Sequence, residues 1–372
     1  MSAKNTQLPG LNVYRALAVI LMILAHAARV QTNMSVLHAN PGQASLLDWP
    51  LVGTLIIEPI ISAMFLFIAG FSLVLSLRGS RESASAWLGR LGWRMGTLYL
   101  ISVVFALADQ GVQWPGVIVS SGVLGIIAVG VFTTGLMLVA PRSIALLAGS
   151  TLVIIGITYG LDSARASVIG LNAGAGGMVP LVVLAYLGAL TGMIYQRAGL
   201  NGLGMVLAAT LLTGALALAS PAPWITQPAT SIQQYPGDRI QAVWHSLLDV
   251  VGLYDGAVHS GIVRYWNHSW IFPLRALPIL VAGLILFLGL IRHTRQHALQ
   301  FLDWMGRQAL NLYILHLVLL AGVEVSGFKP VTGWQTLLMV ALMLALAPWI
   351  LRWVSFVPLR IYWRRNGTGQ AS

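Results

Sequence analysis

Residues 11–30 read LNVYRALAVILMILAHAARV, an apolar stretch that contains two ionisable side chains well inside it, Arg15 and His26. A helix of this length, about 30 Å, would span the hydrocarbon core of a bilayer. Because the two positions are eleven apart, a helix places them on one face, roughly 16 Å apart along its axis. Ionisable groups at such depth are costly and usually face a cavity or a substrate path. The stretch therefore predicts a membrane helix with a functional face.

The composition extends this prediction to the whole chain. Of its 372 residues, 57% are hydrophobic and 8% are charged, and a soluble protein could not bury so much apolar surface. Apolar runs of about 17–25 residues predict roughly ten transmembrane helices. Their approximate limits are 11–31, 51–77, 93–110, 116–140, 143–161, 178–196, 202–220, 272–291, 308–326 and 332–356. We therefore expect an all-α polytopic membrane protein with one integral-membrane domain over residues 1–372.

The net charge of +11 is distributed unevenly between the two sides of this arrangement. With the N-terminus in the cytoplasm, fifteen of the 21 lysines and arginines fall on the cytoplasmic side and six on the other. This positive-inside bias predicts that both termini are cytoplasmic. Topology and attraction to anionic lipid head groups explain the basic surplus, so we expect membrane lipids, and no nucleic acid, as partners.

The chain contains no cysteine, which excludes disulfides, thiolate metal sites and cysteine nucleophiles. The spacing of the histidines matches no zinc signature, so we expect no metal. Lys4, the apolar run after it and Ala25–Ala27 could imitate a cleavable signal peptide. Arg15 interrupts that run and further spans follow at once, so we interpret residues 11–31 as a retained helix.

Two histidines are predicted to lie deep in the membrane. His26 is the main catalytic candidate, because a neutral imidazole can take a proton from an attacking hydroxyl or amine or carry an acyl group itself. His316 ends the segment GRQALNLYILH, about 14 Å beyond Arg307 along a helix, and is the second candidate. For each histidine, a hydrogen bond that only joins neighbouring helices is the alternative.

Four arginines are candidates for binding an anionic ligand on the cytoplasmic side. Arg90 and Arg94 are one helical turn apart, and two guanidinium groups in register suit phosphates, which each can bind in a forked geometry. Arg15 could hold a phosphate or a carboxylate near the cytoplasmic mouth, and Arg307 precedes His316 on its predicted helix. Ordinary topology anchoring and contact with lipid phosphates remain alternatives for these residues.

The segment Pro221–Trp270 is predicted to form a long loop on the outer side of the membrane. It opens with three prolines and then mixes aromatic and polar residues, and loops of this length are often functional. Glu58, near the outer end of the second span, could orient a histidine or accept a hydrogen bond from a sugar hydroxyl. A hydrated interfacial carboxylate is the alternative for Glu58.

Two segments near the start of the sequence resemble the acyltransferase-3 proteins. Residues 11–20, LNVYRALAVI, followed by His26, are similar to that family's first helix, in which ten residues separate an arginine from a histidine. Residues 65–71, FLFIAGF, resemble its second-helix FFxxSGF segment, with Ala69 in place of the usual serine.

Two further segments extend the resemblance in the same order. Arg90 and Arg94 resemble the arginine cluster that opens the family's third helix, and residues 306–316 resemble its late G…SxxxYxxH helix. The last segment and the first helix are also similar to the heparan-glucosaminide acetyltransferase-type relatives. Val13 stands where the family has an aspartate, which leaves the subfamily open, and residues 110–290 carry little that matches.

The resemblance implies an acyltransferase, most commonly an O-acetyltransferase that moves an acetyl group from cytoplasmic acetyl-CoA to a glycan or glycolipid outside. It implies that His26 is the essential histidine, that Arg15, Arg90 and Arg94 lie near the donor, and that His316 is a second candidate. It also implies a bacterial inner membrane. The acyl length, the acceptor and any homo-oligomer stay open.

Aromatic faces suit sugar rings, so the outer loop supplies candidate acceptor-binding residues. They are Trp244, Tyr254, Trp266 and Trp270. A transporter or flippase without covalent chemistry is an alternative, because buried arginine and histidine also line substrate and proton routes. The paired broken helices of many transporters are not evident in the sequence. An acyltransferase of another membrane family, acting on lipids or proteins, is a third reading.

Overall fold

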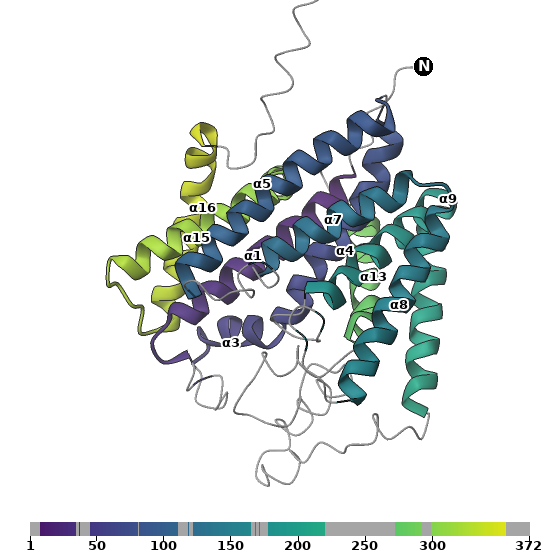
Figure 1. The fold of residues 1–372 in the computed structure, drawn as a ribbon. Coiled ribbons are helices and arrows are strands. Elements are labelled where there is room, and N and C mark those ends of the chain that lie inside the picture. The colour runs from purple at the N-terminus through teal and green to yellow at the C-terminus, as the bar shows by residue number, and fades with distance from the viewer. Residues whose placement is uncertain are drawn as a thin grey trace, which may run out of the picture.

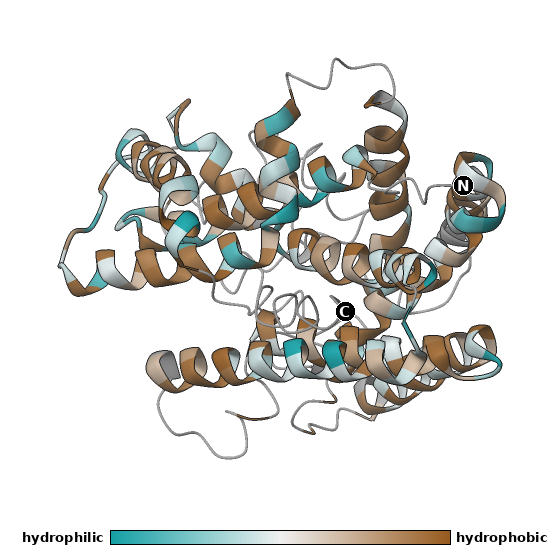
Figure 2. Ribbon diagram, turned by 90° about the horizontal axis from the view of Figure 1, so that it is seen from above, coloured by the Kyte–Doolittle hydropathy of each residue, from teal (hydrophilic) through white to brown (hydrophobic). Residues whose placement is uncertain are grey.

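The computed structural model describes residues 8–34, 45–80, 82–110, 122–164, 178–219, 272–291 and 299–354, together with positions 37, 118, 168 and 171. Within these ranges the chain forms α-helices and no β-strand (Figure 1). Seven of the described helices are long and apolar enough to cross a membrane, or eight if a bent pair counts as one span. Apolar residues predominate along them (Figure 2). The chain is therefore an all-α polytopic membrane protein, as predicted.

Each of the ten predicted apolar runs overlaps a described helix, although the helix limits differ from the run limits and part of the run 116–140 lies outside the described residues. The count of candidate spans is lower than ten because the helix Val123–Val139 is shorter than the others and Val179–Leu212 counts as a single span. In chain order the helices are α1 (Pro9–Val30), α3 (Trp49–Ile56), α4 (Glu58–Gly79), α5 (Ala84–Gln110), α7 (Val123–Val139), α8 (Ser143–Ser163), α9 (Met178–Ala219), α13 (Phe272–Leu290), α14 (Gln300–Arg307), α15 (Ala309–Val325) and α16 (Gly333–Trp353). The second predicted run is split between α3 and α4, and α14 precedes the ninth run as a separate short helix.

Two breaks shape this arrangement. The axis bends by 81° between α14 and α15. Within α9, Gly199 has φ 60° and ψ −143°, a conformation that glycine adopts without steric cost. A Cβ at Gly202 would touch Ile194, although a straight helix would separate these residues by about 12 Å. The chain therefore folds back near Gly199, and α9 supplies two of the predicted spans.

Helix α1 lies at the centre of the bundle (Figure 1). It packs against α4 and α13 on one side and against α14, α15 and α16 on the other, while α3 also contacts it. Its buried residues join all three apolar clusters of the described chain, for example Met22 in the largest, Ile23 in the second and Ala28 in the third. Residues on α1 can therefore meet side chains from most of the fold.

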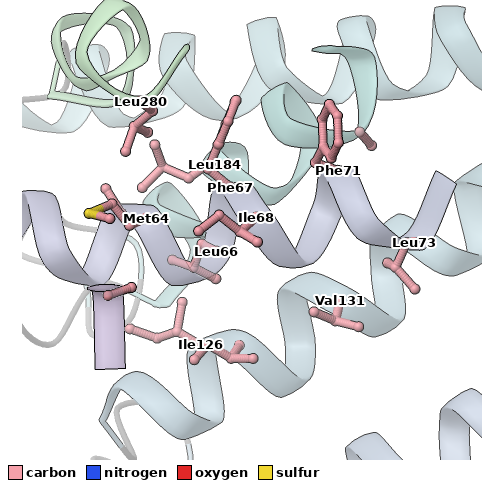
Figure 3. Packing of buried hydrophobic residues seen from close by; sticks show 14 of the residues in the cluster. Met64, Leu66, Phe67, Ile68, Phe71, Leu73, Ile126, Val131, Leu184 and Leu280 are labelled. Atoms are coloured by element: carbon pink, nitrogen blue, oxygen red, sulfur yellow. The ribbon is translucent and has the colours of Figure 1, made fainter. Parts of the chain in front are cut away.

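The largest apolar cluster holds α4 against α9 at very close range. A Cβ on Gly70 would overlap the backbone of α9, and a Cβ on Gly188 would overlap the backbone of Phe67. Figure 3 shows Phe67 beside Leu184 and Leu280. Lipid tails are as apolar as the helices, so small residues that allow backbones to approach are a main source of helix association in membranes. Helix α4, held closely against α9, in turn packs against α1.

Polar side chains tie the C-terminal end of α1 to α3 and α16. Asp48 accepts hydrogen bonds from the Ser45 amide at 3.0 Å, the Ser45 hydroxyl at 2.6 Å and the Gln31 amide at 3.2 Å. Gln31 accepts in turn from the Thr336 hydroxyl at 2.7 Å. Burial alone would raise the pKa of Asp48, but the hydrogen bonds from Ser45 and Gln31 hold it below its ordinary value.

Candidate active site

The structure brings together the two histidines that the sequence singled out. His26 comes from α1 and His316 from α15, and His26 Nδ1 lies 2.8 Å from His316 Nε2. The ring centroids are 5.1 Å apart and the rings are nearly parallel, with 21° between their planes. His316 is 2% exposed, whereas His26 is only partly buried. His316 is therefore enclosed by the protein, whereas part of the His26 side chain remains accessible.

A backbone contact fixes the direction of the hydrogen bond between the rings. His316 Nδ1 lies 3.2 Å from the carbonyl oxygen of Leu312, and a carbonyl oxygen can only accept. Nδ1 of His316 therefore carries a hydrogen, so Nε2 of the neutral ring has none and must accept from His26 Nδ1. This tautomer assignment leaves Nε2 of neutral His26 unprotonated. Such a nitrogen can act as a general base or as a nucleophile.

Two aromatic rings pack around the histidines. The Tyr313 ring lies edge-on to both, at centroid distances of 6.1 Å from His26 and 5.1 Å from His316. Phe65 of α4 lies edge-on to Tyr313 at 5.6 Å. Edge-to-face packing of this kind restricts ring orientation, so the two imidazoles are held in place by side chains from α4 and α15.

An ion pair lies next to the histidines. Arg29 Nη2 donates to both carboxylate oxygens of Glu58, at 2.7 and 2.6 Å, and the Glu58 side chain is 9% exposed. Arg29 follows His26 by one helical turn and is near enough to interact with it electrostatically.

This pairing changes what Glu58 is available to do. The predicted roles of Glu58 were to orient a histidine or to accept a hydrogen bond from a sugar hydroxyl, but its hydrogen-bond partner in the structure is Arg29. Arg29 is one of the six lysines and arginines predicted on the outer side and was not among the candidate site residues. Its position three residues after His26 was the signal that could have identified it, because such residues share a helix face.

At the other end of α1, Arg15 belongs to a polar network that joins three helices. Its guanidinium donates to Asn12 Oδ1 at 3.0 Å and to the Ser72 hydroxyl. Asn12 Nδ2 donates to Asp303 at 2.8 Å, and Asp303 forms an ion pair with Arg307, also at 2.8 Å. In the described part of the chain, Arg307 therefore has a carboxylate partner and Arg15 has none.

The backbone makes this network possible. A Cβ on Gly306 would overlap the backbone of Asn12, so only glycine lets α14 lie directly on α1. Asn12, Ser72 and Asp303 were not identified from the sequence. The spacing of Asn12 three residues before Arg15 was a usable signal, whereas the contacts of Ser72 and Asp303 depend on other helices.

Arg90 and Arg94 lie apart from this network, on α5, which packs mainly against α7. Arg90 forms an ion pair with Glu82, and its Nε atom is fully enclosed without a hydrogen-bond partner. Arg94 is exposed and near enough to Arg90 to interact with it electrostatically. Within the described ranges, no hydrogen bond joins either arginine to Asn12, Ser72 or Asp303.

The remaining predicted site residues belong to the loop 221–270, which lies outside the described residues. They are Trp244, Tyr254, Trp266 and Trp270.

Comparison with known proteins adds to this geometry. Residues 8–173 match the family model described as heparan-alpha-glucosaminide N-acetyltransferase, catalytic. The matched stretch contains His26, Arg15 and the Arg29–Glu58 pair, and it ends before His316. No curated protein matches the chain. The match supports a likeness to heparan-glucosaminide acetyltransferases and an acetyltransferase type of activity in a membrane protein. The resemblance to the acyltransferase-3 proteins stays a prediction.

Proposed function

We propose that this chain is a membrane O-acyltransferase that moves an acetyl group from cytoplasmic acetyl-CoA to an extracytoplasmic carbohydrate or glycolipid. The observation that carries the proposal is the hydrogen bond between His26 and His316, which leaves Nε2 of His26 free. The family match over residues 8–173 supports acetyl transfer as the type of chemistry. No metal takes part in the proposed reaction.

His26 is the general base in this proposal. Its Nε2 accepts the proton of the acceptor hydroxyl while the hydroxyl oxygen attacks the thioester carbonyl carbon, and the carbonyl electron pair moves to oxygen. The intermediate collapses as the C–S bond breaks, and the departing thiolate takes the proton back from His26. His316 is a positioning residue, since its Nε2 holds His26 Nδ1 and the bond strengthens when His26 becomes positively charged.

The same nitrogen could instead carry the acetyl group for part of the cycle. In that route Nε2 of His26 attacks the thioester carbonyl carbon, and the C–S bond breaks to release CoA as its thiolate. The acceptor hydroxyl then attacks the acetyl group, the bond to Nε2 breaks, and the hydroxyl proton passes to the thiolate. Acid-quench trapping of labelled protein in the absence of an acceptor distinguishes the routes, because only the second gives acetylated His26.

The donor phosphates would bind at the Arg15 end of α1. Arg15 is held by neutral groups, Asn12 and Ser72, and has no carboxylate partner among the described residues, so its charge is available to a phosphate. Arg307 is partly neutralised by Asp303 and would contribute less. On α5, Arg94 would supply a further contact to the donor, and Arg90, which Glu82 partly neutralises, would contribute less.

The acceptor would approach from the opposite end of α1, past Arg29 and Glu58. The loop 221–270, with its aromatic residues, would cover it. This orientation assigns both termini to the cytoplasm of a bacterial inner membrane and treats residues 1–372 as one domain. Because the chain has no cysteine, single cysteines at the exposed Ser83 and Ser326 test the topology directly. An impermeant maleimide should label Ser326→Cys in intact cells and should label Ser83→Cys only after lysis.

Incubation of the purified protein with acetyl-labelled CoA tests the activity. We expect slow hydrolysis of the thioester or labelling of the protein, and we expect both to disappear in His26→Ala at an unchanged melting temperature. Binding of acetyl-CoA without hydrolysis, labelling or transfer would instead favour a transporter. Transfer at the native rate by folded His26→Ala would reject the assigned base. Glycan mass spectrometry of a deletion strain should then identify the acceptor as the species that loses acetyl groups.

A further inference from the structure

The hydroxyl of Tyr313 is the polar group near the histidines that the proposed mechanism does not use. Tyr313 is 3% exposed, and among the described residues nothing hydrogen-bonds to its hydroxyl. Tyr14 is equally buried, but its hydroxyl donates to the Leu280 carbonyl oxygen at 3.1 Å. Likewise, buried Tyr186 donates to Thr133 at 3.1 Å. Because buried polar groups normally have a partner, the hydroxyl of Tyr313 calls for a different explanation.

The oxygen of Tyr313 is also not fully enclosed by the protein. In the described part of the chain, the fully enclosed side-chain polar atom without a hydrogen-bond partner is Arg90 Nε. The Tyr313 oxygen, which has no partner either, is therefore not fully enclosed. A partly open hydroxyl on an otherwise buried ring can reach a bound molecule that the protein itself does not supply.

The surroundings of Tyr313 are those of the reacting centre. Its ring lies edge-on to both imidazoles, at centroid distances of 6.1 and 5.1 Å. Tyr313 is also near enough to Glu58 and Arg29 to interact with both electrostatically. The ring of Tyr313 therefore lies close to both the proposed base and the ion pair.

We infer that Tyr313 is a further catalytic residue, whose hydroxyl donates a hydrogen bond to the thioester oxygen as negative charge develops there. This inference rests on the proposed acyl transfer. As the acceptor oxygen bonds to the carbonyl carbon, the C=O electron pair moves to oxygen, and Tyr313 stabilises that oxyanion without giving up its proton. When the electron pair returns, the C–S bond breaks and the thiolate receives the proton from His26.

The chemistry of the side chain suits this role. A phenol with an ordinary pKa of about 10 is protonated at neutral pH and can donate. Fixed donors aimed at a developing oxyanion act most strongly where water is excluded. The rigid ring, held edge-on by Phe65 at 5.6 Å, would keep the donor in place before the reaction begins.

Tyr313→Phe tests the inference, because it removes the hydroxyl and leaves the ring. We expect kcat for acetyl transfer to fall roughly 100- to 1,000-fold, the range for loss of one oxyanion donor. The KM for acetyl-CoA and the melting temperature should stay close to the wild-type values. Tyr14→Phe is the matched control, since it removes an equally buried hydroxyl from the same bundle. It should lower the melting temperature slightly and leave kcat unchanged.

The outcomes separate this inference from the proposed function. If His26→Ala is inactive and Tyr313→Phe has wild-type kcat, the oxyanion role is wrong while the acyl-transfer proposal stands. If both variants have wild-type activity, the acyl-transfer site itself is wrong. A fall in kcat that is matched by an equal fall in Tyr14→Phe, or by loss of melting temperature in Tyr313→Phe, would show that the hydroxyl acts only on the fold and would overturn the inference.

Discussion

The two ends of α1 hold their polar side chains in different ways. At the N-terminal end, Arg15 is a cation bound by neutral groups and has no carboxylate partner in the described part of the chain. At the C-terminal end, the charge of Arg29 is balanced by Glu58, and the histidines beside it bind each other. One end therefore offers an uncompensated charge, and the other offers a neutral ring nitrogen.

This difference separates binding from chemistry. An uncompensated guanidinium suits a phosphate, whose negative charge it can pair. A neutral imidazole with its second nitrogen already engaged suits proton transfer, because one tautomer and one orientation are fixed. The two functions are about 16 Å apart along one helix, so substitutions at the two ends should affect different kinetic constants.

The largest expected effect is at His26. We expect His26→Gln to lower kcat about 1,000-fold, within the range for loss of a general base, with little change in the KM for acetyl-CoA. His316→Gln should cost less, about 10- to 100-fold, because it removes one buried hydrogen-bond partner. Steady-state kinetics on detergent-purified protein measure both. A larger loss at His316 would mean that the roles of the two rings are exchanged, and equal losses would contradict the division into a base and a positioning residue.

The next effect is at the opposite end. We expect Arg15→Gln to raise the KM for acetyl-CoA about 10- to 100-fold, as for loss of one charged hydrogen bond, with kcat nearly unchanged. Arg307→Gln is the control, because Asp303 already pairs with that charge, and its KM should change less. A fall in kcat at constant KM for Arg15→Gln would contradict the division between the two ends.

The smallest effect concerns the stability of the fold and depends on the hydrogen bonds that Asp48 accepts from Ser45 and Gln31. Because hydrogen bonds hold the folded-state pKa of Asp48 below its ordinary value, its carboxylate stabilises the fold at pH values above that ordinary value. This contribution is lost as the pH falls through the folded-state pKa. We expect the melting temperatures of wild type and Asp48→Asn to converge at low pH. A difference that stays constant from pH 7 to pH 3 would show that titration of Asp48 is not involved.

Much of the fold was predictable, because apolar runs of membrane length leave few alternatives to helices. The split at Ile57 was not predicted, although Pro59 stands in the first turn of α4, where proline is favoured. The 81° bend between α14 and α15 carries no comparable signal. The close contact of Gly306 in α14 with the backbone of Asn12 in α1 likewise depends on residues far apart in the sequence.

Individual residues of the candidate site could be predicted from the sequence, but the contacts between them could not. The cost of burying an ionisable group in lipid singled out Arg15, His26 and His316 individually. No local pattern indicates that His26 bonds to a ring 290 positions away. Helical spacing of three residues could have identified Arg29 as a neighbour of His26, just as it places Tyr313 beside His316, because that relation is set within one helix.

The protonation state of His26 tests the account most directly. Nitrogen-15 NMR of histidine-labelled protein in lipid, with His26→Gln and His316→Gln to assign the signals, reports which ring nitrogens carry hydrogen. The account predicts that neutral His26 is protonated at Nδ1 and bare at Nε2, with Nδ1 of His316 protonated as well. A spectrum in which Nε2 of His26 carries the hydrogen would contradict it, because the base would then lack the free electron pair on which the proposed transfer depends.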